Sequence, residues 1–221
     1  MPENLRKTLD FLRDLKANNN KLWFDQNRKR YDAAREHFEA FIGDVILSFS
    51  DIEDLGGVTP KDCLFRINRD VRFSLDKSPY KTNLGAVIGK GGRKPVGRSY
   101  YIQIEPDGYS FIAGGLHSPS PQQLAKVRQS IAKDSAKFKK IIHHSDFTRQ
   151  FGSLRGEALK TAPQGFPKDH PDIELLRFKQ FLAEHTISDE QMLARDLTAH
   201  VVEVLKALKP FVTYLQSALD A

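Results

Sequence analysis

The sequence has little cysteine and no long apolar run. Its 221 residues include one cysteine, Cys63, which excludes an internal disulfide and any metal site built on several cysteines. No apolar run approaches the roughly 20 residues that a membrane-spanning helix needs. The first residues mix charges with leucines and lack the apolar core of a signal peptide. These absences predict a reduced, cytoplasmic setting and no membrane partner.

Familiar catalytic and cofactor-binding motifs are also missing. The sequence contains no HExxH, GxSxG, GxGxxG or paired-cysteine pattern, so we predict no metal ion and no cofactor. The glycine-rich stretch 89–97 lacks the Gly-Lys-Ser/Thr ending of a phosphate-binding loop and does not open a helix. Cys63 precedes an apolar run, which favours a small buried side chain over a nucleophile. The oligomeric state is left open.

Positive charge is present, but it is concentrated in one segment. Residues 61–98 hold ten Lys or Arg against three Asp, so the net charge of this segment is +7. The net charge of the whole chain is +6, so the remaining residues together carry −1. A local positive field of this kind favours one anionic ligand or patch. It argues against a coat of nucleic acid along the whole surface.

The N-terminal half combines long helices with short strands. Leucines at three- and four-residue steps predict a helix over 3–17, and a second apolar face predicts a helix over 21–49 with a break near Asn27. Short segments rich in β-branched and aromatic residues predict strands over 63–68, 84–89, 99–105 and 109–113. The turn 106–108, Pro-Asp-Gly, predicts a tight hairpin between the last two strands.

The C-terminal half is mainly helical. Capping-box patterns at 120–123 and 188–191 predict two helix starts, and a further strand is predicted over 179–187. We therefore predict an α+β fold, with an antiparallel β-meander in the middle of the chain packed against N- and C-terminal helices. A single domain is predicted over 1–221. Its parts are helical over 1–50, mainly β over 58–116 and mainly helical over 120–221.

The stretch RINRDVRFSLDKSPYK, residues 66–81, gathers the most charge. Arg66, Arg69 and Arg72 lie three residues apart. Arginine supplies paired N–H donors that match phosphate or carboxylate, so these three side chains are predicted to bind an anion, with Lys81 completing the site. In a strand over 63–74, Arg69 falls on an apolar face. It then needs a carboxylate or a bound anion, because an unpaired buried charge is prohibitive.

The other polar residues of this stretch receive different roles. Asp70 lies between Arg69 and Arg72, and these cations are expected to depress its pKa. A carboxylate with a low pKa is a poor proton acceptor, so we predict that Asp70 orients an arginine within the ligand site. The same cations are expected to lower the pKa values of Tyr80 and Lys77. These two side chains are the predicted groups for any proton transfer.

Other interpretations stay open. The arginine stretch can be a purely structural salt-bridge network, because perturbed charges also occur in such networks. It can also form a nucleic-acid-binding or acidic-partner-binding module together with the loop 89–98. His117 is a further ligand-binding candidate at a strand end. His170 and Arg177 form a second cationic cluster, unless His170 only caps the helix that starts at Asp172.

The motif RxxRDxRF followed by DKxPYK resembles the signature of a widespread bacterial family of conserved proteins of unknown function and about this length. The resemblance extends over nearly the whole chain and includes Asn19-Asn20 with Trp23-Phe24, and the segment 165–171. It implies that these residues occur together, and it brings no established activity, substrate or cofactor. The sequence thus predicts a conserved protein with an anion-binding pocket for a small ligand, and leaves open whether it is an enzyme.

Overall fold

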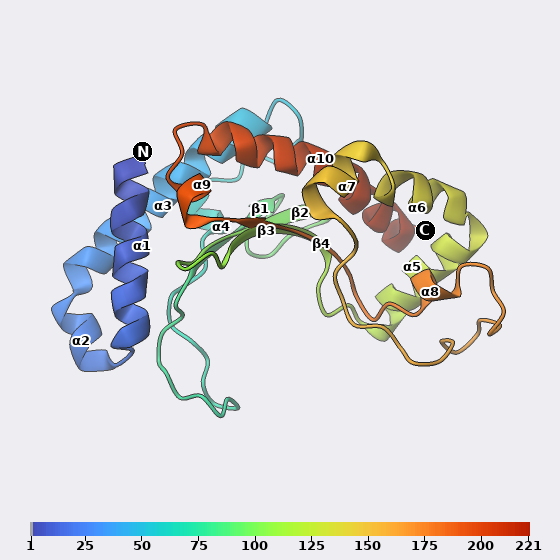
Figure 1. Ribbon diagram of the computed structural model, residues 1–221, viewed down its shortest axis with the longest axis horizontal. Coiled ribbons are helices and arrows are strands. Elements are labelled where there is room, and N and C mark those ends of the chain that lie inside the picture. The colour runs from blue at the N-terminus through green and yellow to red at the C-terminus, as the bar shows by residue number, and fades with distance from the viewer. Residues whose placement is uncertain (1) are drawn as a thin grey trace. The chain divides into compact units, whose positions relative to one another are not determined.

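The structure is a computed structural model that describes residues 2–221, with side chains from residue 4 onward. Figure 1 shows helices in both the N- and C-terminal parts of the chain and strands between them, which is the predicted α+β fold. The helices are α1 (Pro2–Ala17), α2 (Lys21–Gln26), α3 (Arg28–Phe49), α4 (Pro60–Cys63), α5 (Pro121–Lys133), α6 (Ser135–Ile142), α7 (Ser145–Phe151), α8 (Ile173–Leu176), α9 (Asp189–Met192) and α10 (Leu197–Asp220). The strands are β1 (Leu84–Gly89), β2 (Ser99–Ile104), β3 (Ser110–Leu116) and β4 (Phe181–Ile187).

The strands form one antiparallel sheet in the order β1-β2-β3-β4, which confirms the predicted meander. Alternate residues of β2 are buried, whereas β1 is buried at every position except Val87. The register places Ala86 opposite Ile102 and Ile88 opposite Tyr100. The turn between β2 and β3 also forms as predicted. Asp107 and Gly108 have φ values of 67° and 79°, the pair of positive angles that is typical of a type I′ turn.

The chain divides into two compact units, each made of two segments. Unit 1 comprises residues up to 112 and 186–203, and unit 2 comprises 113–185 and 204–221. The borders fall inside β3, β4 and α10 rather than in linkers. The single domain expected from the sequence therefore stays a prediction, and the units are described separately below.

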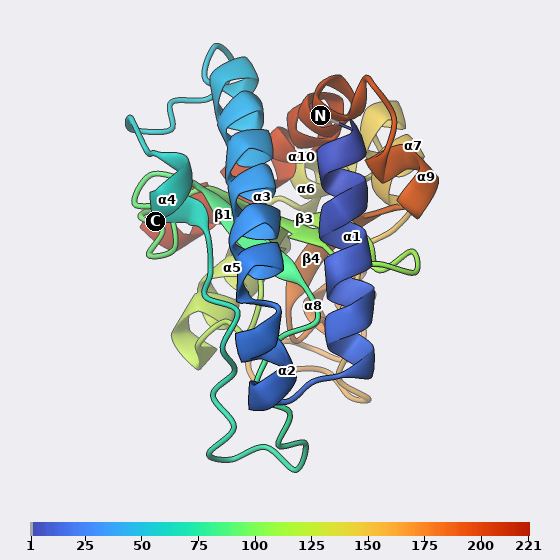
Figure 2. The same ribbon diagram turned by 90° about the vertical axis from the view of Figure 1, so that its left-hand side faces the viewer.

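In unit 1 the helices α1 and α3 run side by side in opposite directions (Figures 1 and 2). The buried face of α3 packs on β1 and β2, where the rings of Phe49 and Tyr100 meet edge to face at 5.2 Å. Between α1 and α3, the Asn20 side chain accepts a hydrogen bond from the Trp23 amide and so begins α2. The break predicted near Asn27 is confirmed, because α2 ends at Gln26 and α3 begins at Arg28.

The strand predicted over 63–68 is wrong. Thr59 and Asp62 form a capping box with Pro60 at the first helical position, and these three residues start α4 instead. After α4 the chain pairs with its surroundings at two isolated bridges, Leu64 with Ala86 and Asn68 with Tyr80. Between Asn68 and Tyr80 it forms a loop that projects beyond α2 (Figure 2).

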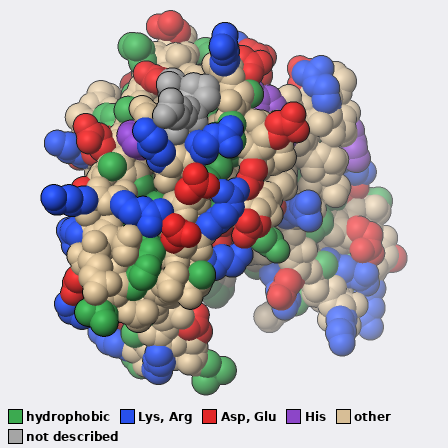
Figure 3. All heavy atoms as spheres, turned by 60° about the vertical axis from the view of Figure 1, so that its left-hand side comes forward, with side chains coloured by type: hydrophobic (Ala, Val, Ile, Leu, Met, Phe, Trp, Pro, Cys, Tyr) green, Lys and Arg blue, Asp and Glu red, His purple; other side chains and the backbone are tan. Residues whose placement is uncertain are grey.

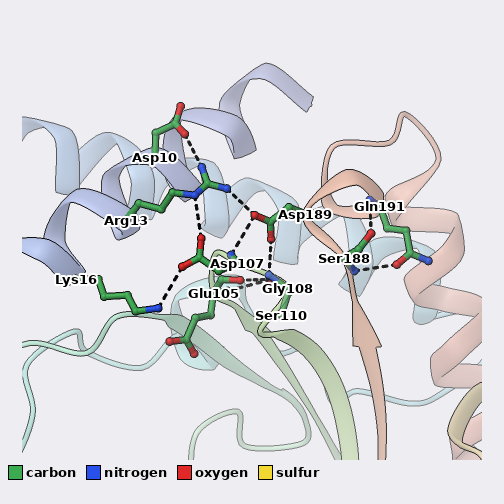
Figure 4. A network of polar contacts seen from close by, with 10 residues as sticks. All are labelled: Asp10, Arg13, Lys16, Glu105, Asp107, Gly108, Ser110, Ser188, Asp189 and Gln191. Atoms are coloured by element: carbon green, nitrogen blue, oxygen red, sulfur yellow. Dashed lines mark hydrogen bonds and ion pairs between the residues drawn. The ribbon is translucent and has the colours of Figure 1, made fainter.

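A polar network joins the β2–β3 turn to α1 and to the start of α9 (Figure 4). Asp189 accepts hydrogen bonds from the backbone amides of Asp107 and Gly108, each at 3.0 Å, and from Arg13 at 2.5 Å. The Asp107 side chain in turn accepts from Lys16 at 3.1 Å. The predicted capping box at Ser188 and Gln191 is present and fixes the position of Asp189 in the first turn of α9.

Unit 2 contains α5 to α8, the adjoining parts of β3 and β4, and the second part of α10. Its core includes Phe138, whose ring lies 4.9 Å from that of Tyr214 and 6.0 Å from that of Phe181. A Cβ on Gly115 would meet the Phe181 carbonyl oxygen at 2.0 Å, so β3 approaches β4 closely because this residue is glycine. Within the described residues no helix, α10 included, combines the length and apolarity that crossing a membrane requires.

Candidate anion-binding site

Unit 1 contains a hollow of about 230 Å³ bordered by α2, α3 and the chain that follows α4. Four arginines line it: Arg28, Arg35, Arg66 and Arg93. The remaining lining residues are Phe24, Asp25, Tyr31, Leu64, Ile67, Asn68 and Tyr80. We call this hollow the arginine pocket. It is unusual in that four cationic side chains share a small space with a single carboxylate.

Helix spacing places half of these arginines. Arg28, Tyr31 and Arg35 follow each other at three- and four-residue steps, so they lie on one face of α3. The guanidinium of Arg28 lies 5.4 Å from the centre of the Tyr31 ring. Cation–π contact of this kind holds a guanidinium against an aromatic wall.

Three aromatic rings form the wall of the arginine pocket. Phe24 stacks on Tyr80 with ring centres 3.9 Å apart and planes 16° apart, and it meets Tyr31 at 5.1 Å. Tyr80 is held from behind by Asn19, whose side chain accepts from the Tyr80 amide at 3.1 Å and donates to the Tyr80 carbonyl at 2.9 Å. These contacts fix a buried tyrosine at the pocket while the neighbouring loop projects away.

Arg66 and Arg93 come from segments distant from α3 in the sequence. The Arg93 amide and its Nε both donate to the Asp62 carbonyl, at 3.0 and 3.1 Å. The approach requires glycine at position 92, because a Cβ there would lie 2.4 Å from the same carbonyl oxygen and φ is +56°. Arg66 lies between Phe65, whose amide donates to Gly85, and Ile67, whose carbonyl accepts from Lys81.

The arginine pocket has an excess of positive charge without matching carboxylates. Asp25 is paired with Lys21 at 2.5 Å, and Arg28 has Asp32 at 3.2 Å. The side chains of Arg35 and Arg66 make no hydrogen bond or ion pair with any other residue that the structure describes. Guanidinium groups gathered in this way repel each other, and an anion between them removes that repulsion while accepting paired N–H donors.

Arg69 does not line the arginine pocket; it holds its own loop closed. Its guanidinium pairs with Asp76 and donates to Ser74 and to the Ser78 carbonyl, both at 3.3 Å. Its amide donates to the Pro79 carbonyl at 2.9 Å. The carboxylate that the sequence demanded for a partly buried Arg69 is thus supplied by Asp76, and no bound anion is needed to satisfy it.

Arg72, Asp70 and Lys77 also make their contacts inside the loop. Asp70 accepts two hydrogen bonds from the Arg72 guanidinium, at 2.9 and 2.6 Å, and these hold its pKa below the usual range, with Arg66 adding a smaller effect. The direction of this shift is the expected one, but Arg72 and Arg66 cause it and Arg69 does not. Asp70 holds the Arg72 guanidinium, and its role in a ligand site stays a prediction. Lys77 donates to the Val71 carbonyl at 3.0 Å. Of the three predicted anion-binding arginines, the structure places only Arg66 at the arginine pocket.

Of the two predicted proton-transfer groups, Tyr80 lines the arginine pocket and Lys77 does not. Lys81 is half-buried and does not line the arginine pocket. Its ammonium lies 5.3 Å from the centre of the Phe65 ring. Burial lowers the pKa of Lys81, and the nearby Arg66 lowers it further. Cys63 is buried, and burial raises its pKa to about 11, so at neutral pH it is a thiol without nucleophilic character.

The remaining predicted ligand residues belong to unit 2. His117 is exposed directly after β3. His170 and Arg177 flank the two ends of α8: Nδ1 of His170 accepts from the Asp172 amide at 3.0 Å, and Arg177 donates to Glu174 at 2.8 Å. This histidine contact lies before α8, whose N-cap residue is Asp172, so it does not cap the helix itself. A ligand-binding role for these three residues stays a prediction.

Sequence reasoning missed three of the pocket arginines. Arg28 and Arg35 gave one signal, their helical spacing with Tyr31, but nothing in the sequence shows what that face meets. Arg93 lies in the basic loop 89–98, which the sequence connects only with a nucleic-acid-binding or acidic-partner-binding module. The structure instead shows it fixed on α4.

The surface over α1, a helix that lines no part of the arginine pocket, is mixed in charge. Over α1, Figure 3 shows basic and acidic side chains interspersed, and ion pairs such as Arg13 with Asp10 and Arg30 with Asp14 account for this pattern. Among the described residues no group of three or more His, Cys, Asp or Glu is arranged to hold a metal ion. The chemistry that the site offers is anion recognition beside tyrosine hydroxyls.

Comparison with known proteins places the chain in a family. Residues 7–214 match the model of a family described as conserved hypothetical protein (DUF2461). The chain belongs to this family. No curated protein and no solved structure matches it. Membership of DUF2461 confirms the resemblance drawn from the sequence as far as a conserved family of unknown function is concerned. Because the DUF2461 description carries no activity, function has to be argued from the residues of the site.

Proposed function

We propose that this DUF2461 protein binds a small phosphate or carboxylate anion in the arginine pocket. The observation that carries the proposal is the convergence of Arg28, Arg35, Arg66 and Arg93 on one hollow of about 230 Å³. The one lining carboxylate, Asp25, is already paired with Lys21. Planar guanidinium groups bind phosphate and carboxylate through paired hydrogen bonds, which favours these anions over a halide.

The size and surroundings of the pocket favour a small ligand over a polymer. Nucleic acid binding depends on several phosphate contacts along a positive surface. The excess positive charge here is concentrated at a hollow of about 230 Å³, which suits a small anion. A catalytic role and a cytoplasmic location stay predictions. Tyr80, with its hydroxyl-bearing ring at the pocket, is the proposed proton donor if the bound anion reacts.

Thermal unfolding with and without phosphate tests the proposal. At ten times its dissociation constant a ligand stabilises the folded state by about 1.4 kcal/mol, which raises the Tm of a chain of this length by roughly 3–6 °C. We expect this rise for the native protein at constant ionic strength. Arg35→Ala and Arg66→Ala should lose it, whereas Arg6→Ala, an exposed arginine of α1 outside the pocket, should keep it.

The variant Arg69→Ala tests whether the anion binds in the arginine pocket or at the site that the sequence motif alone predicts. Arg69 contacts its own loop, so this variant should keep the phosphate-induced rise in Tm even if its starting Tm is lower. Loss of the rise in Arg69→Ala but not in Arg35→Ala would move the site to the loop. No rise in the native protein would refute anion binding.

A further inference from the structure

A second hollow of about 820 Å³ adjoins the arginine pocket in unit 1. Arg66 and Arg93 line both, so the two hollows share a wall of guanidinium groups. The other lining residues of the second hollow are Gly56, Gly57, Val58, Asp62, Phe65, Gly91 and Lys94. A ligand held by Arg66 at one end can therefore extend past it into a larger space of different chemistry.

The second hollow offers an aromatic face and exposed backbone. Phe65 is half-exposed, and its ring is supported by the Lys81 ammonium at 5.3 Å and by the Tyr101 ring at 6.3 Å. Gly56 and Gly57 carry no side chains, and their φ values of 66° and 68° lie in the region that favours glycine. A Cβ on Gly57 would meet nothing within 4 Å, which shows open space at this wall. Such a hollow suits a planar group that stacks on a ring and hydrogen-bonds to backbone.

Asp62, the one carboxylate that lines the second hollow, does not cancel the positive charge of Arg66, Arg93 and Lys94. Asp62 accepts hydrogen bonds from the Thr59 amide at 3.0 Å and from the Thr59 hydroxyl at 2.6 Å, as part of the α4 capping box. Its carboxylate therefore serves the helix start. Arg66, Arg93 and Lys94 keep the hollow positive, so a neutral aromatic molecule fits it less well than one that carries an anionic group.

We propose that the ligand is a phosphate monoester with a planar aromatic body. Its phosphate lies in the arginine pocket near Arg35 and Arg66, and its body lies in the second hollow against Phe65. Nucleoside 5′-monophosphates are the simplest probes of this class. The inference rests on the proposed anion binding and adds the class of molecule that carries the anion.

Titration calorimetry with four probes tests the inference: inorganic phosphate, ribose 5-phosphate, adenosine and AMP. Stacking of a base on an aromatic side chain changes binding roughly 5- to 150-fold. We expect AMP to bind at least about tenfold more tightly than ribose 5-phosphate, and adenosine to bind more weakly than either. Arg35→Ala should weaken binding of all three phosphates.

Phe65 variants test the second hollow separately. Phe65→Leu keeps an apolar side chain at this half-buried position, and it should lose the advantage of AMP while leaving phosphate and ribose 5-phosphate unchanged. Phe65→Trp should retain that advantage. Circular dichroism checks that both variants are folded, so loss of AMP binding in a folded Phe65→Leu protein reports on the ring itself.

The outcomes distinguish the two proposals. Phosphate binding without any advantage of AMP overturns the aromatic body and leaves the arginine pocket as an anion site. Absence of binding by every phosphate probe overturns both. A single-stranded oligonucleotide that binds more than a hundredfold more tightly than AMP, with strong salt dependence, overturns the small ligand in favour of a nucleic acid.

Discussion

At the scale of single residues, Asp76 determines whether the projecting loop keeps its shape. Its carboxylate accepts from the Ser78 hydroxyl and amide and pairs with Arg69, and these contacts hold its pKa well below the usual range. Because the pKa is lower in the folded than in the unfolded state, this stabilisation is present above about pH 3.9. It is lost as the pH falls through the lower, folded-state value.

Removal of the Asp76 charge should open the loop at neutral pH. We predict that Asp76→Asn leaves global stability nearly unchanged, since the residue is exposed, but increases tryptic cleavage at Arg69, Arg72 and Lys77 severalfold. Asp70→Asn is the matched control, because Asp70 pairs with Arg72 only two residues away and does not join the two arms of the loop. Equal cleavage in the two variants would contradict the role given to Asp76.

Lys81 should make stability depend on pH in the alkaline range. Burial and Arg66 lower its pKa in the folded state, so the unfolded chain binds this proton more tightly. Stability therefore rises as the pH increases from the folded value towards about 10.4. We predict that Lys81→Met gains Tm relative to the native protein at pH 7, and that the gain shrinks by pH 10. Lys29→Met, an exposed change in α3, should show no such trend.

At the scale of elements, the Asp189 network holds the β2–β3 turn to two helices (Figure 4). The Asp189 side chain is 26% exposed and accepts two backbone N–H groups and the Arg13 guanidinium. Hydrogen bonds to a charged group contribute about 1.5–3 kcal/mol. We predict that Asp189→Ala lowers the free energy of unfolding by about that amount in urea titrations. Asp10→Asn, which removes an exposed partner of Arg13, should cost less than about 1 kcal/mol.

Elements with local signals could be predicted from the sequence. The two capping boxes and the Pro-Asp-Gly turn each depend on residues within a few positions, and all three form as expected. The wrong prediction of a strand over 63–68 also came from relying on a local pattern. Local alternation favoured a strand, but Thr59, Pro60 and Asp62 begin a helix just before it, and pairing with β1 lasts only briefly, at the Leu64–Ala86 bridge.

The candidate site was predictable only in part because it joins distant elements. Arg66 and Tyr80 belong to the motif and reach the arginine pocket, whereas Arg69 and Arg72 find carboxylates within their own loop. Arg28 and Arg35 come from α3, more than 30 residues before Arg66. Their meeting depends on how α3 packs against β1, and no local pattern encodes that packing.

At the scale of the whole molecule, the concentrated positive charge and both hollows belong to the same unit. The basic segment 61–98 lies entirely in unit 1, and so do the arginine pocket and the second hollow. Unit 2 contributes none of the residues that line them. The ligand class proposed above can therefore be tested without knowing how the two units are arranged.

The two units should nevertheless unfold together. Neither is a continuous stretch of chain, since their borders fall within β3, β4 and α10. A unit that unfolds alone must therefore break two strands and a helix partway, which favours a single cooperative transition.

Trp23, the one tryptophan, lies in α2 and reports on unit 1, whereas far-ultraviolet circular dichroism reports on the helices of both units. We predict that urea titrations followed by tryptophan fluorescence and by circular dichroism have the same midpoint and slope. Two separated transitions would mean that the units are independent domains, against the single domain expected from the sequence.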